Sequence, residues 1–204
     1  MQFIHSRLIL ALWFLWCVYW FAASLRSKPA MRQESFASGA LHRLPLLLAI
    51  ALFLVPPRRI GWLGAQFLPR SPPLFWLGTI LVAAGLGWSV LARVYLGGNW
   101  SAAVTVKQDH ELIRTGPYRW TRHPIYTGLL VAFAGSAIAL AEWRGLIALA
   151  LVVVAFLRKS AIEERFMMAQ FPDTYPRYRA EVPALIPHPR STSPALRERS
   201  PRGR

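Results

Sequence analysis

Five apolar runs constrain this chain more than any other feature, because each is long enough, or nearly long enough, to cross a lipid bilayer. A helix needs about 20 residues to span about 30 Å of hydrocarbon. Three uncharged runs approach that length, at residues 8–25, 74–92 and 125–141. Two shorter runs, at residues 44–55 and 145–157, need flanking residues or snorkelling arginines to complete a span. We therefore predict an all-α, multi-pass integral membrane protein with about five transmembrane helices.

The composition agrees with a membrane protein. Of the 204 residues, 54% are hydrophobic and only 16% are charged. The net charge of +15 could indicate nucleic acid, but the basic residues lie between apolar runs and in the tail, without a recognition motif. We expect anionic membrane lipids as neighbours and no nucleic-acid partner. The single cysteine, Cys17, excludes an intrachain disulfide and a cysteine-based metal site, and we predict no metal.

The distribution of basic residues predicts an orientation. With five spans the termini face opposite sides, and 19 Lys and Arg residues fall on one side against 5 on the other. The positive-inside rule then places the C-terminus in the cytoplasm, in an inner or plasma membrane. The first run lacks a convincing cleavage site, so we interpret it as an anchor and not as a signal peptide. Residues 93–124 and everything after residue 157 share the cytoplasmic side.

Connections and breaks divide the chain further. Residues 26–43 and 56–73 are basic or proline-rich and are interpreted as connectors. The brief break at 142–145 predicts an antiparallel hairpin of the fourth and fifth helices, whose close approach we attribute to Gly128, Gly135, Ser136 and Ala139. An amphipathic pattern predicts that the fifth helix continues to about residue 171. We expect one domain over 1–187 and a disordered basic tail over 188–204.

A polar segment at residues 116–128, Gly-Pro-Tyr-Arg-Trp-Thr-Arg-His-Pro-Ile-Tyr-Thr-Gly, overlaps the start of the fourth apolar run. Polar groups beside hydrocarbon are costly unless they line a cavity, so the segment indicates a site. Free N–H groups in the first helical turn, near Tyr126 and Thr127, could receive an anionic group such as a cofactor carboxylate. Each arginine alone could snorkel to headgroups and each tyrosine could be an interface anchor; their clustering favours a site.

A second cluster, Arg158 with Glu163 and Glu164, emerges from the fifth run. Taken alone it could be an ordinary surface ion pair, which contributes little. The short hairpin, however, brings these carboxylates beside the polar segment, where they could hold a cation. A third stretch, residues 171–187, carries aromatic residues and prolines and is interpreted as a cytosolic cap over a pocket.

These motifs resemble a known family. Gly-Pro-Tyr at 116–118, Arg-His-Pro-x-Tyr-x-Gly at 122–128, Arg-x4-Glu-Glu-Arg-Phe from 158, and Phe-x3-Tyr-x2-Tyr-x3-Val-Pro-x3-Pro at 171–187 are similar to the isoprenylcysteine carboxyl methyltransferase family and the related phospholipid methyltransferases. The resemblance covers about residues 95–187. It implies a membrane enzyme that uses S-adenosyl-L-methionine, held by this half of the chain, on a lipid-like or prenylated acceptor that enters from the bilayer.

The resemblance also implies roles for individual residues. Arg158 and Glu163 would be catalytic, and Arg158 would bind substrate together with Tyr175 and Tyr178. Cofactor binding would involve eight residues, which are Tyr118, Arg122, His123, Pro124, Tyr126, Gly128, Glu163 and Glu164.

The sequence leaves more than one methyl acceptor and more than one class of reaction open. Carboxyl O-methylation is the main hypothesis, with Arg158 orienting the carboxylate and Glu163 or Glu164 binding the cofactor ammonium. An amine acceptor, as in phospholipid N-methylation, would first have to lose a proton to Tyr118, His123 or a glutamate. A membrane sterol-type reductase using NADPH shares the Arg-His-Pro-x-Tyr-x-Gly element. A non-enzymatic membrane scaffold would explain the hydrophobicity but not the polar segment. Oligomeric state stays open.

Overall fold

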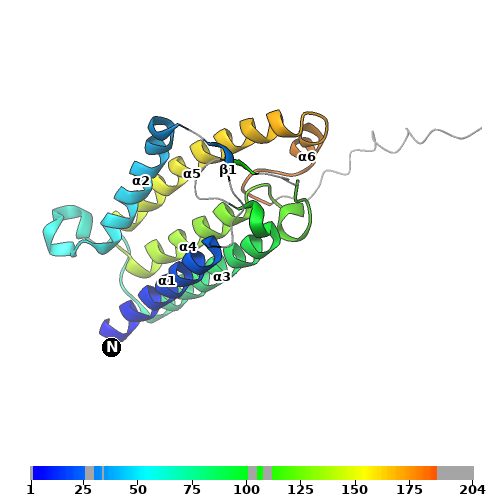
Figure 1. The fold of residues 1–204 in the computed structure, drawn as a ribbon. Helices are drawn as coiled ribbons and strands as arrows, with labels where there is room; N and C mark the ends of the chain where they lie inside the picture. Colours follow the sequence, from blue (N-terminus) through cyan, green and yellow to red (C-terminus); the bar gives the residue numbers. More distant parts are fainter. Residues whose placement is uncertain (1, 26–29, 34, 101–104, 108–111, 188–204) are drawn as a thin grey trace, which may run out of the picture.

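The computed structural model describes residues 2–25, 30–33, 35–100, 105–107 and 112–187. Five long helices dominate the described part of the chain (Figure 1). They are α1 (Gln2–Ser24), α2 (Phe36–Leu54), α3 (Pro72–Leu96), α4 (Pro124–Leu140) and α5 (Trp143–Gln170). A shorter helix, α6 (Tyr175–Glu181), follows α5. The tail predicted to be disordered, residues 188–204, lies outside the described residues.

Each of the five predicted spans corresponds to one long helix. Four of them, α1, α2, α3 and α5, are long and apolar enough to cross a membrane by length and composition, whereas α4 is a shorter apolar helix of 17 residues. The predicted continuation of the fifth helix is confirmed, because α5 extends without a break to Gln170. The number of actual crossings stays a prediction.

Short elements complete the connections. Within the described ranges there are four 3-10 turns, η1 (Pro57–Arg59), η2 (Gly61–Gly64), η3 (Gly97–Asn99) and η4 (Gly116–Arg119). Strands β1 (Ala30–Gln33) and β2 (Thr105–Lys107) pair in an antiparallel ribbon, in which Gln33 lies opposite Thr105.

The interpretation of residues 26–43 as a connector was wrong for much of its length. Residues 30–33 form β1, and α2 already begins at Phe36. Ser35 caps α2, since its Oγ accepts a hydrogen bond from the Ser38 N–H at 3.3 Å. The early start gives α2 19 residues, which supplies the length that its apolar run lacks.

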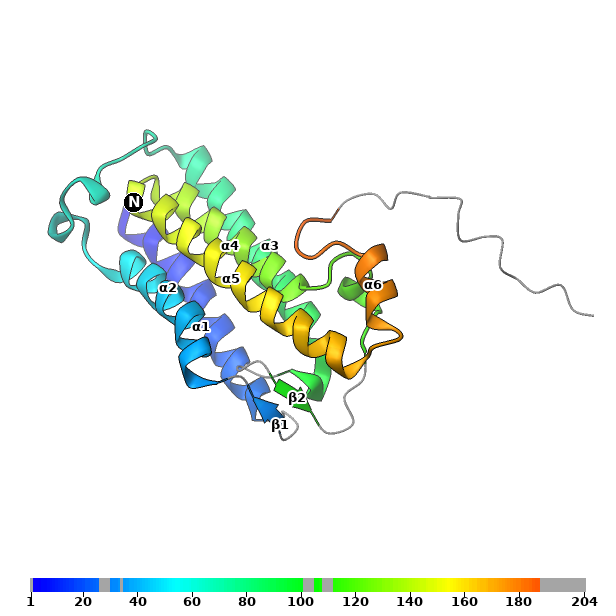
Figure 2. The same cartoon turned by 90° about the horizontal axis from the view of Figure 1, so that it is seen from above.

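The helices form two groups that meet at α4. Helix α4 packs against α3 on one side and α5 on the other, α1 packs along α3, and α2 packs along α5 (Figures 1 and 2). Two tryptophans of α1 bond this helix to α4 and α3. Trp13 Nε1 donates to Ser136 Oγ of α4 at 3.1 Å, and Trp16 Nε1 donates to Ser89 Oγ of α3 at 2.8 Å. Both indole N–H groups are thereby satisfied, so their rings can face an apolar space.

Helices α3 and α4 approach closely through glycines spaced seven residues apart on each. Gly78 lies against Gly135, where an added Cβ would come 2.5 Å from the Gly135 carbonyl oxygen, and Gly85 lies against Gly128. Our attribution of Gly128 and Gly135 to the α4–α5 contact was therefore wrong. Spacing of seven residues is close to two helical turns, so each pair shares one face, and that face meets the matching glycines of α3. The α4–α5 contact instead uses Gly145 against Ala137.

The tight turn between α4 and α5 contains a fully buried carboxylate, Glu142, at 0% exposure. Glu142 accepts hydrogen bonds from Arg70 Nη2 and, at 2.6 Å, from Arg144 Nε. Arg144 also donates to the carbonyls of Leu52 and Val55 at the end of α2. The turn that we interpreted as a simple connection thus joins α2, α5 and the segment before α3.

Two glycine-to-alanine substitutions on α3 test the close contact between α3 and α4. Gly85→Ala should destabilise the protein by about 2 kcal/mol, because its Cβ would lie 2.6 Å from the Ala132 backbone nitrogen, which cannot move freely. Gly87→Ala has no atom within 4 Å and should be neutral or slightly stabilising, because alanine has the higher helix propensity. Unfolding by denaturing detergent, followed by circular dichroism, measures both; equal stabilities of the two variants would contradict the close packing.

Candidate active site

The polar segment 116–128 folds as one 3-10 turn followed by the start of α4. Gly116 has φ of +57°, and a Cβ there would collide with the ring of Tyr95, so both backbone and space require glycine. The 3-10 turn η4 buries Pro117 and Tyr118. His123 precedes Pro124, the first residue of α4, and is buried. The predicted proline-shaped entrance to this helix is confirmed.

Two adjacent carboxylates of α5 meet this segment. His123 lies between them, with Nδ1 3.4 Å from Glu163 Oε2 and Nε2 3.2 Å from Glu164 Oε1. The Tyr126 hydroxyl donates to Glu163 Oε1. The predicted convergence of the two polar segments is therefore observed. The rings of His123, Tyr126 and Phe156 stack successively, with centroid separations of 5.5 and 4.7 Å.

Glu164 joins the helices to the C-terminal cap, residues 171–187. Arg122 donates to Glu164 Oε1 from Nε at 2.9 Å and from Nη2 at 2.7 Å, and both side chains are about nine-tenths buried. Arg179 of α6 lies 3.1 Å from the other oxygen, Glu164 Oε2. The Arg122 Nη1 group also donates to the carbonyls of Arg179 and Val182. The hydrogen bonds of this network involve charged groups, and such bonds are stronger than those between neutral groups.

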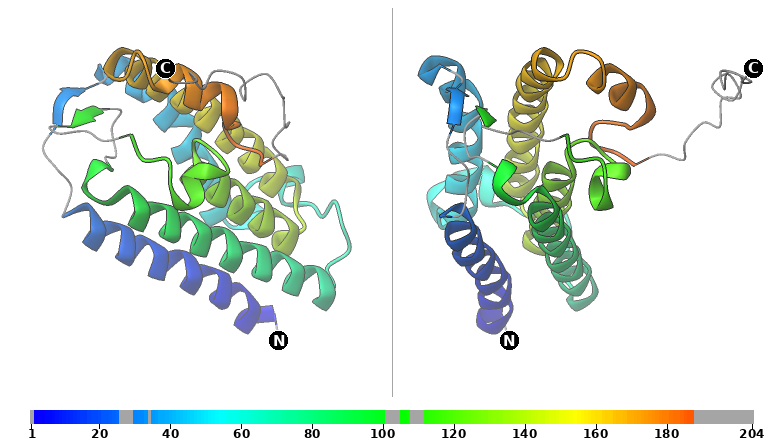
Figure 3. Two further views of the ribbon diagram at one scale, coloured as in Figure 1. Left: turned by 90° about the vertical axis from the view of Figure 1, so that its right-hand side faces the viewer. Right: turned by 45° about the vertical axis from the view of Figure 1, so that its right-hand side comes forward.

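The backbone of the cap lies across the start of α4. The amides of Arg122 and His123 donate to the carbonyls of Pro183 and Ala184 at 2.8 and 3.0 Å. Tyr178 of α6 donates its hydroxyl to the Tyr118 carbonyl at 2.6 Å. Figure 3 shows the cap curving from the end of α5 toward the turn before α4. The predicted cap thus closes over the polar segment.

The environment shifts several pKa values outside the membrane-spanning segments. Burial alone would lower the pKa of His123, but the two glutamates that bond its ring raise it above the ordinary value. Burial raises the pKa of Tyr118, and Glu163 adds to the increase. Burial also raises the pKa of Tyr178 to about 12. The two glutamates therefore stabilise the protonated form of His123, and burial stabilises the neutral form of both tyrosines.

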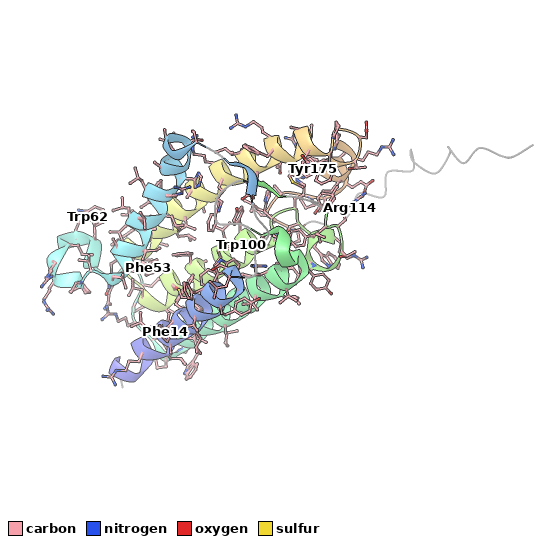
Figure 4. All side chains as sticks on the ribbon, viewed as in Figure 1. Phe14, Phe53, Trp62, Trp100, Arg114 and Tyr175 are labelled. Carbon is pink, nitrogen blue, oxygen red and sulfur yellow. The ribbon has the colours of Figure 1, made fainter. Side chains whose placement is uncertain are left out.

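A large cavity, about 1540 Å³, extends from this cluster into the helices. At its polar end it is lined by Tyr118, Arg122, His123, Tyr126, Lys159, Glu163, Tyr175 and Tyr178. Further along, apolar side chains of α1, α2 and α4 line it, including Phe14, Phe53 and Leu129. Figure 4 labels three of the lining residues, Phe14 on α1, Phe53 on α2 and Tyr175 on α6. The cavity therefore joins a charged end to an apolar channel.

The predicted residues do not all reach this cavity. Pro124 and Glu164 are not among the residues that line it, and Gly128 faces α3. Glu164 lies behind the wall and holds Arg122 in place. The expectation of a free N–H at Thr127 was wrong: that amide donates to the His123 carbonyl at 3.0 Å, and the Thr127 hydroxyl donates to Leu185.

Arg158 occupies a different face of α5 from Glu163. It is not among the lining residues, and its Nη2 lies 3.5 Å from Ser38 Oγ of α2. Its neighbour Lys159 lines the cavity instead, with Nζ 5.5 Å from the centroid of the Tyr126 ring. The sequence did contain a signal for Lys159, because it precedes Glu163 by four residues, the spacing that puts two side chains on one helical face. The catalytic role of Arg158 stays a prediction.

Comparison with known proteins identifies the family. The profile of the phospholipid methyltransferase family matches residues 73–174, which is half of the chain and includes α3, α4 and α5. The chain belongs to the phospholipid methyltransferase family.

Individual relatives of this protein are similar to it over part of their length. Protein-S-isoprenylcysteine O-methyltransferase of Schizosaccharomyces pombe is 32% identical over 47% of this chain and 42% of its own length. Cobalt-zinc-cadmium resistance protein CzcN of Cupriavidus metallidurans is 26% identical over 72% of this chain and 64% of its own length. The solved structure of a eukaryotic intramembrane Ras methyltransferase, isoprenylcysteine carboxyl methyltransferase, has a TM-score of 0.49 and 23% identity, over 72% of this chain and 52% of that one. The chain spans less than two thirds of each.

The raised pKa of His123 predicts a pH dependence with a definite sign. The stability that its charged form contributes is complete below the unfolded-state pKa of about 6.5 and is lost as the pH rises through the higher folded-state value. His123→Asn should therefore cost more stability at pH 6 than at pH 9. Detergent-unfolding curves of both proteins at the two pH values measure this, and ¹⁵N NMR of the imidazoles should show His123 titrating above 6.5. A pH-independent stability difference would contradict the paired imidazolium.

Proposed function

We propose that this protein is an S-adenosyl-L-methionine-dependent membrane methyltransferase that methylates a carboxylate on a lipid-like, prenyl-bearing acceptor. The main observation behind this proposal is one continuous cavity, which joins the charged His123–Glu163 end to an apolar channel between the helices. Membership of the phospholipid methyltransferase family supports the reaction class, and the isoprenylcysteine methyltransferase relatives support the acceptor class. We further propose that the polar end faces the cytoplasm, as the distribution of basic residues predicts.

The polar end fits the charge pattern of S-adenosyl-L-methionine. When bound, this cofactor supplies an electrophilic methyl group carried on a positively charged sulfur. Glu163 lines the cavity and is partly exposed, at 26% of its side chain, so its carboxylate is available to a cofactor ammonium. Arg122 and His123 line the same end; their donors already bond glutamates and cap carbonyls, so they would attract a cofactor carboxylate through charge and not through a free donor. Tyr175 and Tyr178 form the aromatic wall of the cap.

The chain's own groups favour an anionic acceptor. Lys159 places a positive charge in the cavity wall one helical turn before Glu163, on the side toward the apolar channel. An acceptor carboxylate is already ionised near neutral pH, so it requires orientation but no base. An amine acceptor would first have to lose a proton. Both ring nitrogens of His123 already face glutamate oxygens, and Glu163 already accepts from Tyr126, so neither is well placed to take that proton.

Methyl transfer is an in-line displacement, in which a new oxygen–carbon bond forms as the sulfur–carbon bond breaks. Such a reaction gains most from alignment of the reacting atoms and from exclusion of water. In this protein Lys159 would align the acceptor oxygen, and the cap, fixed by Arg122 and Tyr178, would exclude water from the polar end. The apolar channel would hold the acceptor's hydrocarbon chain.

Ligand binding separates this function from its alternatives. The purified protein should bind S-adenosylhomocysteine and not NADPH, whereas a sterol-type reductase would bind NADPH and a scaffold neither. Isothermal titration calorimetry in detergent measures both. Glu163→Gln should weaken S-adenosylhomocysteine binding about tenfold, the usual loss for a hydrogen bond between charged groups. Binding of NADPH alone would overturn the proposed cofactor.

Two neighbouring residues of α5 provide a matched test of the acceptor. We propose that Lys159, and not Arg158, orients the acceptor carboxylate. Lys159→Met should lower the rate of methyl transfer from labelled S-adenosylmethionine about 100-fold, the usual loss for one charge-stabilising group, with S-adenosylhomocysteine affinity changed less than about threefold. Arg158→Met should keep most of the activity, because its guanidinium faces α2. The opposite ranking would restore the role predicted for Arg158. Farnesylcysteine with a free carboxylate is the test acceptor.

A further inference from the structure

A second charged region lies at the end of the cavity opposite His123. Three arginines line the cavity there: Arg58 in η1, Arg70 before α3, and Arg144 in the first turn of α5. The buried carboxylate of Glu142 accepts hydrogen bonds from Arg70 and Arg144. In the part of the chain that the structure describes, these three guanidinium groups have one carboxylate among them. This end of the cavity therefore carries a net positive charge.

The three arginines differ in what their donors already bind. Arg144 is buried, and its donors are used by Glu142 and by carbonyls of α2, so its role is structural. Arg70 bonds Glu142 through Nη2, but 43% of its side chain is exposed. Arg58 is exposed, and within the described residues it has no ion-pair partner. Arg58 and Arg70 thus present guanidinium groups at the cavity mouth.

The region between the two charged ends is apolar. Along α4, the lining residues Leu129, Phe133 and Leu140 recur on one face. The facing tryptophans of α1 have their N–H groups bonded to serines, so they add ring surface and no unsatisfied donor. With 17 residues, α4 is about 25 Å long, close to the thickness of a hydrocarbon layer. The far arginines are consequently too distant to act on the group that receives the methyl.

We propose that Arg58 and Arg70 bind the phosphate of an anionic phospholipid, whose acyl chain enters the adjoining apolar part of the cavity. Guanidinium groups match phosphate oxygens in geometry and charge, and both arginines line the cavity in the connection between α2 and α3, outside the apolar helices. A purely apolar ligand would leave the arginines unused, and a free anion would leave the apolar wall unused. The bound lipid would form the floor beneath the acceptor channel. This binding site does not depend on the proposed methyl transfer.

Native mass spectrometry of the full chain in detergent tests the site with dioleoylphosphatidylglycerol and dioleoylphosphatidylcholine. The protein should bind the anionic lipid about tenfold more tightly than the zwitterionic one, because both lipids carry the phosphate but the choline cation of the latter is repelled by the two guanidinium groups. Arg58→Gln should remove most of that preference. Arg59→Gln is the matched control, since Arg59 lies in the same 3-10 turn but does not line the cavity, and it should keep the preference.

Other outcomes would overturn the proposal. Equal affinity for the two lipids would exclude an anion site, and equal losses in the Arg58 and Arg59 variants would indicate general surface charge. Inorganic phosphate at the lipid concentration should displace no lipid; full displacement would exclude a contribution from the chain. Arg58→Lys, which keeps the charge, should give an intermediate preference. Unchanged thermal unfolding of each variant without lipid separates a binding loss from misfolding, and unchanged S-adenosylhomocysteine binding separates this site from the methyl-transfer site.

Discussion

The bonds that Glu164 makes to Arg122, His123 and Arg179 are the interaction on which the candidate site depends. These four residues come from the loop between η4 and α4, from α5 and from α6, so one carboxylate fixes three parts of the chain. Burying such charges is costly, and that cost is recovered only when every partner is present with good geometry. Loss of one partner would leave a buried charge uncompensated. The cluster therefore specifies one position of the cap, even where its net contribution to stability is small.

That cluster can form only because α4 is held rigidly. The glycines of α3 and α4 bring the two backbones into contact and fix the height of Pro124 and His123 relative to α3. At the other end of α4, the Glu142 turn fixes the helix to α2 and to the segment before α3. Interfaces of small residues are a common solution within lipid, where no hydrophobic driving force exists between helices. The position of the charged cluster therefore depends on the glycine contact between α3 and α4.

Much of this architecture could be predicted from the sequence, and the reasons are physical. The five helices follow from apolar length, and the meeting of His123 with Glu163 follows from a hairpin with almost no slack between Leu140 and Trp143. The partner of Gly128 could not be predicted, because a glycine indicates close approach without saying to which helix. The start of α2 was missed because His42 and Arg43 separate its first turns from the apolar run at residues 44–55, and the Ser35 cap marks where the helix begins. Arg158 was named on motif resemblance, and the position of its neighbour Lys159 on the cavity wall was not predicted; a shift of one residue on a helix turns a side chain by about 100°.

The same rotation explains how one helix can separate three tasks. On α5, Lys159 and Glu163 share a face and point into the cavity, Glu164 points toward Arg122 and the cap, and Arg158 points toward α2. The proposed binding role, the positioning of Arg122 and helix packing thus use different directions around one axis, within about two turns. Under the proposed function, a different acceptor would require no new helix. It would require a different side chain on the cavity face, or a different wall from α1 and α2, while the Glu164 bonds and the α3–α4 contact could stay as they are.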